Sequence, residues 1–136
     1  MGNNIDSIFP KGNPAPADRF TGSSFVNPLL PGNREPYFCQ ISDVYFEKKS
    51  RNNWHIHPAG QVLLATAGTG YYQERGKKAQ KLEKGDMVEV PMDVEHWHGA
   101  APDSDFIHIS ITPNMPKGDA KWLNPVTDKE YEEAML

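Results

Sequence analysis

The stretch that decides the fold covers residues 55–70 and reads HIHPAGQVLLATAGTG. His55 and His57 stand one residue apart, and Gln61 follows four residues after the second histidine. Side chains alternate between the two faces of a β-strand, so both histidines point the same way. The intervening Pro-Ala-Gly favours a turn. The stretch therefore predicts two strands joined by a turn, with three polar side chains converging on one place.

The other three histidines repeat this device. His96 and His98 flank a tryptophan, and His108 lies in the segment FIHISIT, residues 106–112. In a strand, His108 shares its face with Ser110 and Thr112 and with the phenylalanine that opens the segment. The opposite face of that strand carries Ile107, Ile109 and Ile111. We expect all five histidines to lie in strands. Two H-x-H pairs and a fifth histidine, with no histidine elsewhere, favour a shared metal site over unrelated placement.

The ligand types indicate a catalytic rather than a structural metal. Neutral imidazole binds zinc, manganese, iron, nickel or copper, and an amide oxygen suits the harder of these ions. A structural zinc site normally uses cysteines, but the only one, Cys39, lies outside the cluster beside apolar residues and is predicted to be a small core residue. Three histidines and Gln61 would leave coordination positions open for water or substrate.

Composition narrows the class of protein. The 136 residues suit a single domain, and 38% hydrophobic with 24% charged residues is ordinary for a soluble globular protein. No apolar run is long enough for a membrane span, and we expect no membrane partner. The net charge is −4, and the lysines and arginines are scattered along the chain. Nucleic-acid binding requires a concentrated basic surface, so we expect no nucleic-acid partner. The start of the chain has no secretory leader, and a lone cysteine forms no internal disulfide, so we expect a cytoplasmic protein.

Prolines and glycines punctuate the chain every eight to twelve residues, and this spacing predicts an all-β sandwich or barrel. Gly76 and Gly85 mark two tight turns, and Thr127 to Glu130 reads as a capping box that opens a helix ending at Met135. Strands are predicted near Phe20–Val26, Tyr37–Glu47, Asn53–His57, Gln61–Thr69, Gly70–Arg75, Gln80–Glu83, Met87–Val90, His96–His98 and Phe106–Thr112.

Two motifs resemble those of the cupins. The first is formed by His55, His57, Gln61 and Gly68, and the second, GDMVEVPMDVEHWH at 85–98, has its glycine, proline and His96 in register. Asp93 and Ala100 stand where that family often has glycine and asparagine. The resemblance implies an all-β cupin double-stranded β-helix, a jelly-roll barrel. The expected parts are a single domain over 1–136, with an irregular N-terminal arm at 1–19, the barrel at 20–112 and a C-terminal tail with a short helix at 113–136.

Within the cupins, the chain is most similar to small single-domain members with a glutamine ligand, the carboxymuconolactone-decarboxylase-like group. Four segments resemble the cupin-type hydroxynitrile lyases: PADRFTG from residue 16, HWHGAAP from residue 96, FIH from residue 106 and VTDKEY from residue 126. The similarity covers most of the chain. It implies a lyase that breaks or forms a C–C bond beside a hydroxyl or carbonyl group.

The resemblance also implies roles for individual residues. The metal ligands would be His55, His57, Gln61 and His96, holding one divalent transition metal per chain, with manganese favoured and iron, zinc or nickel as alternatives. The catalytic residues would be His98 and His108, which lie beside the metal and move a proton. A neutral glutamine in place of a carboxylate leaves the site one unit more positive, so a substrate oxygen would be more strongly polarised.

The leading hypothesis is therefore a metal-dependent enzyme acting on a small hydroxy or carbonyl substrate by Lewis-acid and histidine acid–base chemistry. An iron-dependent dioxygenase-type cupin is an alternative, since three histidines and one oxygen ligand also suit iron. A non-catalytic module that binds or senses a small molecule is another.

Further residues have simpler expected roles. Trp54 and Trp97 lie opposite the histidine faces and are predicted to pack, and Asp43 and Glu89 are predicted to be solvated strand positions. Ser110 and Thr112 either line the pocket or pack in the interior. An outer apolar face formed by Val62, Leu64 and the three isoleucines of 106–112 predicts a homodimer or homotetramer.

Overall fold

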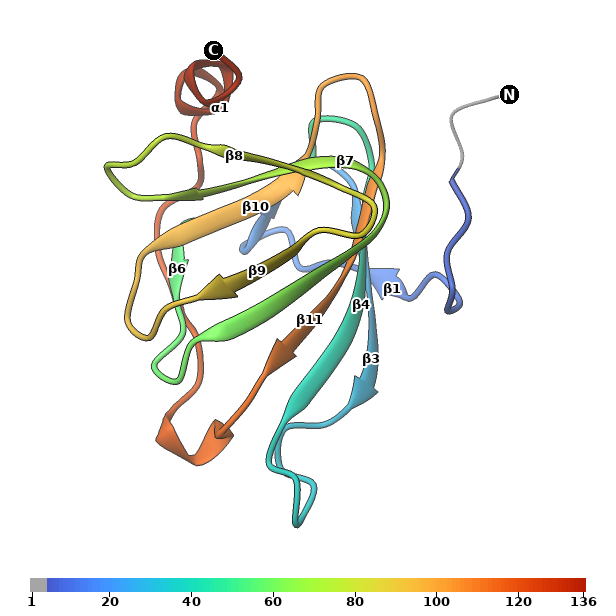
Figure 1. Cartoon of the computed structure of the whole chain (residues 1–136), viewed down its shortest axis with the longest axis vertical. Coiled ribbons are helices and arrows are strands. Elements are labelled where there is room, and N and C mark those ends of the chain that lie inside the picture. Colours follow the sequence, from blue (N-terminus) through green and yellow to red (C-terminus); the bar gives the residue numbers. More distant parts are fainter. Residues whose placement is uncertain (1–4) are drawn as a thin grey trace.

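The structure, a computed structural model, describes residues 5–136 as strands with one short helix near the C-terminus (Figure 1). This confirms the predicted all-β class. Within these residues no helix is long and apolar enough to cross a membrane. The elements are β1 (Asn13–Pro14), β2 (Phe20–Thr21), β3 (Ser24–Leu30), β4 (Gln40–Phe46), β5 (Arg51–Asn52), β6 (His55–Ile56), β7 (Gln61–Glu74), β8 (Gln80–Glu83), β9 (Met87–Val90), β10 (His96–Ala100), β11 (Phe106–Thr112), the 3₁₀ turn η1 (Met115–Lys117), β12 (Lys121–Trp122) and α1 (Asp128–Ala134).

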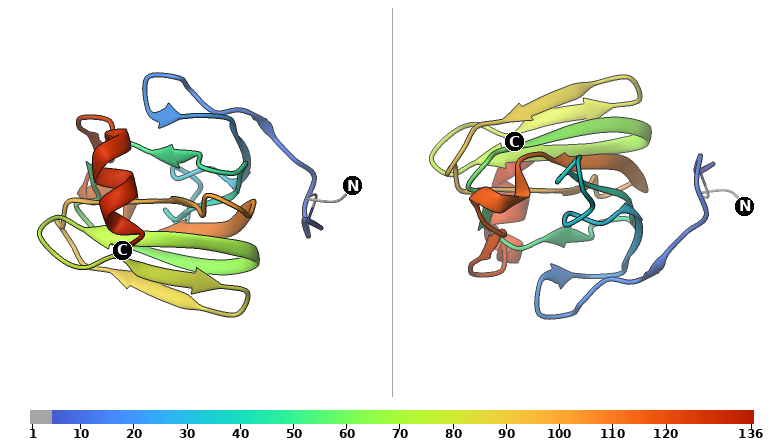
Figure 2. Two further views of the ribbon diagram at one scale, coloured as in Figure 1. Left: turned by 90° about the horizontal axis from the view of Figure 1, so that it is seen from above. Right: turned by 90° about the horizontal axis from the view of Figure 1, so that it is seen from below.

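Two antiparallel sheets share β7 and curl towards each other (Figure 2). In the first sheet the order is β1-β3-β4-β11-β7-β9, and in the second it is β2-β5-β10-β7-β8, with β6 joining β10 to β12. The N-terminal half of β7 pairs with β9 and β11, and the C-terminal half pairs with β8 and β10. Because one strand belongs to both sheets, the interior between them is closed along β7.

The chain from Gln61 to Glu74 is one strand, and the prediction of two strands meeting at Thr69 was wrong. Gly68 marks the bend where β7 passes from one sheet to the other, with φ of 73°. A Cβ atom at Gly68 would lie 1.9 Å from the carbonyl oxygen of Asp105. Glycine here bends the strand without ending it, because it tolerates both the positive φ and the close backbone approach.

Three other predicted strands differ from the structure in their bounds. The segment predicted at 20–26 splits at Gly22, whose φ is 88°, so that β2 enters the second sheet and β3 the first. Of the segment predicted at 53–57 only His55 and Ile56 form a strand, β6, and His57 directly follows it. The strand predicted from Tyr37 begins only at Gln40, after Phe38 with φ of 45°.

Several local predictions are confirmed. The strands at 80–83, 87–90 and 106–112 have the expected bounds, and the turns at Gly76 and Gly85 have positive φ. Thr127 caps α1 through a capping box with Glu130, as the sequence predicted. Asp93 adopts φ of 62°, in the left-handed region that favours glycine.

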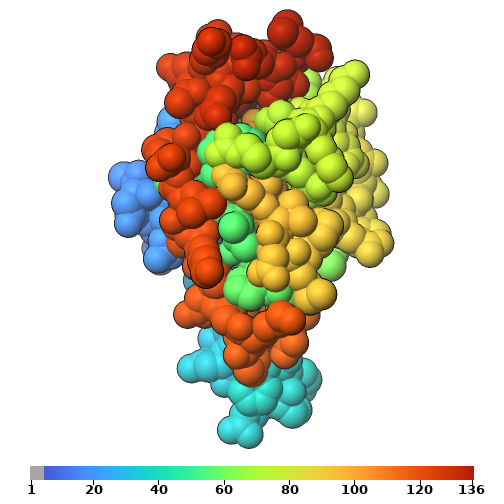
Figure 3. Space-filling model, turned by 90° about the vertical axis from the view of Figure 1, so that its left-hand side faces the viewer, coloured from blue at the N-terminus to red at the C-terminus, as the bar shows by residue number. Residues whose placement is uncertain are grey.

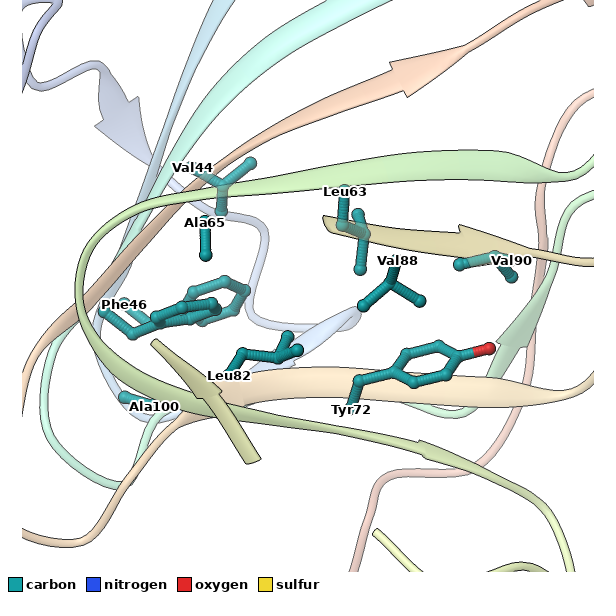
Figure 4. Packing of buried hydrophobic residues seen from close by; sticks show 10 residues of the cluster. Val44, Phe46, Leu63, Ala65, Tyr72, Leu82, Val88, Val90 and Ala100 are labelled. Carbon is teal, nitrogen blue, oxygen red and sulfur yellow. The ribbon is translucent and has the colours of Figure 1, made fainter. Parts of the chain in front are cut away.

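Apolar side chains fill the space between the sheets from the bend of β7 towards Val90, pointing towards one another from both sheets (Figure 4). Phe46 and Phe106 stack here with ring centroids 6.2 Å apart. Large buried side chains of this kind each contribute about 1.5–3 kcal/mol of hydrophobic stabilisation. The buried members of this cluster are Val44, Phe46, Leu63, Ala65, Tyr72, Leu82, Val88, Val90, Ala100 and Phe106.

A second apolar cluster lies under α1 on the outer side of the second sheet. Trp54 and Trp97 are buried there against Tyr131 of the helix, which confirms their predicted packing role. The Tyr131 hydroxyl donates to the carbonyl oxygen of Ala100 at 2.6 Å. Figure 3 shows the C-terminal segment running along one side of the molecule up to this helix.

The N-terminal arm passes over the outer face of β3 and β4. The hydroxyl of Ser7 donates to Asp43 Oδ2 at 3.1 Å, and the Asn27 amide donates to the carbonyl oxygen of Pro10 at 2.8 Å. Asp43 is only 3% exposed, so its prediction as a solvated position was wrong, and burial raises its pKa. Glu89 is exposed as predicted. Cys39 is half-buried in the loop before β4, outside the core where the sequence placed it.

Candidate metal centre and its pocket

A pocket of about 400 Å³ lies between the sheets, next to the apolar core. One wall is polar and carries Ser42, Ser110 and Thr112, and another is formed by the aromatic rings of Phe20 and Trp122. Ser110 and Thr112 thus line the pocket, the first of their two predicted alternatives. Histidines and one glutamine form the inner part of the lining: His55, His57, Gln61, His98 and His108.

Strand pairing brings the histidines of the two H-x-H pairs together in space. His96 of β10 pairs directly with His55 of β6, and their ring centroids are 4.2 Å apart. The His57 ring lies 5.0 Å from His55 and 5.6 Å from His96. Gln61 opens β7 after a turn at Gly60, whose φ of 80° lets the chain reverse. The two H-x-H pairs and Gln61 therefore surround one small volume.

Hydrogen bonds behind two of these histidines fix which nitrogen faces inward. Nδ1 of His55 donates to the carbonyl oxygen of Asn53 at 2.7 Å, and Nδ1 of His96 donates to that of Val94 at 2.9 Å. A neutral imidazole with its proton on Nδ1 carries a lone pair on Nε2. Metal-binding histidines are oriented by the same kind of outer contact.

Gln61 is oriented in a related way. Its Nε2, at the start of β7, donates to Oγ1 of Thr112, at the end of β11, at a distance of 3.2 Å. Oε1 of Gln61 is then the atom left without a partner. An amide oxygen held inward in this manner is an available oxygen ligand for a divalent ion.

Several buried polar atoms without partners lie in this one place, and a neutral imidazole offers one of its two ring nitrogens as an acceptor. Both ring nitrogens of His57, Nε2 of His96 and Oε1 of Gln61 are buried and make no hydrogen bond. Buried polar atoms are normally satisfied, because leaving one unpaired costs about 1–3 kcal/mol. The donor set fits a divalent transition metal, which would satisfy these lone pairs together.

Three histidines are positioned to bind a metal ion in a tighter group. His55, His96 and His98 each bring one nitrogen within 4.8 Å of the others. The first two belong to the predicted ligand set, whereas His98 was predicted to move protons. Hydrogen bonds distinguish them, because both ring nitrogens of His98 already contact other side chains, whereas Nε2 of His96 has no partner.

Burial keeps the cluster neutral. Desolvation lowers the pKa of His57 to about 3 and that of His96 to about 4, and it holds the pKa of His55 well below its usual value. Neighbouring histidines lower the pKa values of His55 and His57 further. Neutral imidazole is the form that binds metals, so these histidines are in the protonation state that metal binding requires.

A second pair of histidines lies against the first group. Nε2 of His108 is 2.8 Å from Nδ1 of His98, and both side chains are buried. Desolvation lowers the pKa of His108 to about 3 and that of His98 well below its usual value. A direct bond between two neutral imidazoles requires one ring to donate and the other to accept, so the pair can pass a proton between its rings.

Two residues of the site were missed from the sequence. Trp122 stacks on His55 with ring centroids 4.5 Å apart, and Asn52 contacts His98. Trp122 reaches the site because β12 pairs with β6, and Asn52 because β5 pairs with β10. Neither residue belongs to a periodic motif, so only the long-range pairing of short strands could reveal them.

Comparison with known proteins identifies the family of this chain. The profile of the cupin domain matches residues 43–112. The (R)-mandelonitrile lyase of Granulicella tundricola is 37% identical over 116 residues, which cover 85% of this chain and 88% of that protein.

Solved structures lead to the same family. A cupin-like protein from Thermotoga maritima superimposes with a TM-score of 0.93 at 47% identity, covering 95% of this chain and 97% of that one. The DMSP lyase DddQ from Ruegeria pomeroyi shares the fold at 20% identity, with a TM-score of 0.64 over 82% of this chain and 55% of its own. The chain therefore belongs to the cupin family and is a small cupin that resembles the hydroxynitrile lyases.

Proposed function

We propose that this protein is a metal-dependent lyase that cleaves an α-hydroxynitrile into a carbonyl compound and hydrogen cyanide. The observation that carries the proposal is the placement of two histidine systems in one pocket: unpartnered inward-facing acceptors on one side and the bonded His98–His108 pair on the other. The 37% identity to a mandelonitrile lyase supports the same class of substrate.

The proposed ligands are His55, His57, Gln61 and His96, holding one divalent transition metal, with manganese favoured. His98 is assigned to proton transfer because its ring nitrogens are taken by Asn52 and His108. When bound, the metal would supply Lewis-acid stabilisation of negative charge on the substrate oxygen. All four ligands are neutral, so none of them reduces the charge of the ion.

The reaction needs one proton moved between two substrate atoms. The His98–His108 pair accepts the proton of the substrate hydroxyl, the C–C bond to the nitrile breaks with its electron pair leaving on the cyanide carbon, and the pair returns the proton to cyanide. The carbonyl forms from the oxygen that lost the proton. Both rings line the pocket, and burial lowers the pKa of each, so the pair is unprotonated before the substrate binds.

The remaining lining suits the organic part of such a substrate. Phe20, Val26 and Trp122 offer apolar surface beside the histidines. An aromatic ring attached to the hydroxyl carbon would pack on these side chains and exclude water from the reacting atoms. The pocket volume of about 400 Å³ lies in the range of small-ligand sites.

The test is release of cyanide and benzaldehyde from (R)-mandelonitrile by protein loaded with manganese, at acidic pH where the spontaneous reaction is slow. We expect turnover in the wild type, loss of both metal and turnover in His55→Ala, and loss of turnover with metal retained in His108→Ala. Metal content is measured by elemental analysis in every sample.

A fully loaded wild type with no cyanide release above the metal-free protein would overturn the proposal. Oxygen uptake that depends on an added substrate would instead favour the iron-dependent dioxygenase. Saturable binding of a small molecule without product would favour the binding module.

A further inference from the structure

Asn52 is a buried side chain whose two polar atoms both face His98. It belongs to β5, which pairs with β10 through Arg51 and Gly99. A Cβ atom at Gly99 would lie 2.5 Å from the Cβ of Arg51, so glycine is what lets these strands approach so closely. The approach places the Asn52 amide next to the ring and the backbone of His98.

The orientation of the Asn52 amide follows from its first hydrogen bond. The backbone N–H of His98 donates to Oδ1 of Asn52 at 2.9 Å. A backbone N–H can only donate, so the atom that faces it must be the amide oxygen. Nδ2 is therefore the atom directed at the His98 ring, where it lies 3.2 Å from both ring nitrogens.

This arrangement constrains the proton of His98. Nδ2 of Asn52 can only donate, and it is equally close to both ring nitrogens, so the bond to His108 distinguishes them. An N–H on Nδ1 has an acceptor in Nε2 of His108, whereas an N–H on Nε2 would face only the Asn52 donor. Nδ1 of His98 is already bonded to His108 at 2.8 Å, which leaves Nε2 as the acceptor for Asn52. The ring proton then sits on Nδ1 of His98 and is donated to Nε2 of His108.

We propose that Asn52 is a positioning residue that fixes His98 in the Nδ1–H tautomer and so sets the direction of the hydrogen bond from His98 to His108. The pair then has one route of proton transfer, from Nδ1 of His98 to Nε2 of His108. This inference rests on the proposed function for its catalytic consequence, whereas the tautomer itself is independent of any activity.

The variant Asn52→Asp replaces the amide donor that faces the His98 ring with an acceptor of almost the same shape. One carboxylate oxygen keeps the bond from the His98 backbone, and the other can only accept, so it favours an N–H on Nε2 of His98. Nδ1 then becomes the acceptor, and the bond to His108 reverses. Asn52→Ala removes the constraint without reversing it. Asn27→Asp is the matched control, since Asn27 contacts the carbonyl of Pro10 in the arm.

The decisive measurement is long-range ¹H–¹⁵N NMR on metal-free protein with labelled histidines at neutral pH, in which protonated and unprotonated ring nitrogens resonate far apart. We expect Nδ1–H for His98 in the wild type and in Asn27→Asp, Nε2–H in Asn52→Asp, and a mixture in Asn52→Ala. Signal dispersion in the same spectra verifies folding. Nε2–H in the wild type, or an unchanged tautomer in Asn52→Asp, would overturn the inference.

Kinetics on the manganese-loaded protein then test the consequence. Asn52→Asp should lower kcat for mandelonitrile by at least about 10-fold with little change in KM, because proton transfer contributes about 10²-fold or more to such reactions. Asn27→Asp should retain the wild-type kcat. An unchanged kcat in Asn52→Asp with a reversed tautomer would overturn the catalytic role. An inactive wild type would count against the proposed function alone, and the NMR result would still decide the tautomer.

Discussion

At the scale of single residues, the site depends on neighbours that point each donor atom. Gln61 illustrates this, because its amide has two chemically different ends and only the oxygen can bind a metal. Oγ1 of Thr112 accepts a hydrogen bond from the Gln61 amide nitrogen, and the amide oxygen is left facing inward without a partner. The sequence identified Gln61 as a ligand candidate, but its orientation comes from a residue on another strand.

We predict that Thr112→Val weakens metal binding by about 10-fold, since loss of an outer hydrogen-bond partner commonly costs 10–100-fold in affinity. Valine keeps the shape of threonine and removes the acceptor for Gln61. Affinity is measured by competition with a chelator. Thr66→Val is the matched control, because Thr66 bonds the carbonyl of Ile107 away from the site. Equal affinity losses in both variants would refute the role of Thr112.

The buried histidines make stability depend on pH in a defined direction. Desolvation lowers the pKa of His108 from 6.5 to about 3, so below pH 6.5 the unfolded chain binds a proton that the folded chain does not. The free energy of unfolding therefore falls as pH decreases from 6.5 towards 3, by up to about 1.4 kcal/mol per pH unit for one such group.

We predict that His108→Gln makes this dependence shallower by about 1 kcal/mol per pH unit between roughly pH 6 and 4.5. Urea unfolding of the metal-free protein at a series of pH values measures it. Thr66→Val should keep the wild-type slope. Parallel curves for His108→Gln and the wild type would contradict the prediction.

At the scale of elements, β7 is the structural link between the two sheets. Its single bend at Gly68 replaces the two separate strands expected from the sequence, because alternation of side chains says nothing about whether a strand continues through a glycine. The contact that requires glycine comes from Asp105, far along the chain. The same bend places Gln61 at one end of the strand and the partners of His96 and His98 at the other.

We predict that Gly68→Ala destabilises the fold by at least about 2 kcal/mol, since a positive φ alone costs roughly 1–3 kcal/mol for a non-glycine residue. The new methyl group would also collide with the carbonyl oxygen of Asp105. Chemical denaturation measures the loss. Gly76→Ala is a useful comparison, because Gly76 has a positive φ but nothing within 4 Å of the added atom. A loss in Gly68→Ala no greater than that in Gly76→Ala would exclude the steric contribution.

At the scale of the whole molecule, other segments cover parts of the outer faces of both sheets. The helix α1 covers part of the second sheet, and the N-terminal arm covers part of the first. Ile107, which the sequence placed on an exposed outer face, is fully buried. The half-buried remainder consists of neighbouring pairs across β7 and β11: Val62 with Ile111, and Leu64 with Ile109. Met87 beside Leu64 is 51% exposed.

We predict a homodimer or homotetramer assembled through this face, because exposed apolar patches of this kind usually meet a partner. Leu64→Lys should shift the protein towards monomer in sedimentation experiments at micromolar concentration. Met92→Lys is the control, since Met92 is an exposed hydrophobic residue in the loop after β9. A wild type that sediments as a stable monomer would remove the prediction.

The sequence by itself determined the all-β class, the strand positions of His55, His96, His98 and His108, and the capped C-terminal helix. These follow from local rules: the two-residue period of strands, glycine at positive φ and the capping box. The tertiary structure alone decided that Asp43 is buried under the arm, that β7 is continuous, that Asn52 and Trp122 touch histidines, and that Thr112 bonds Gln61. Each of these depends on pairing between segments distant along the chain, and local alternation does not specify which strands become neighbours.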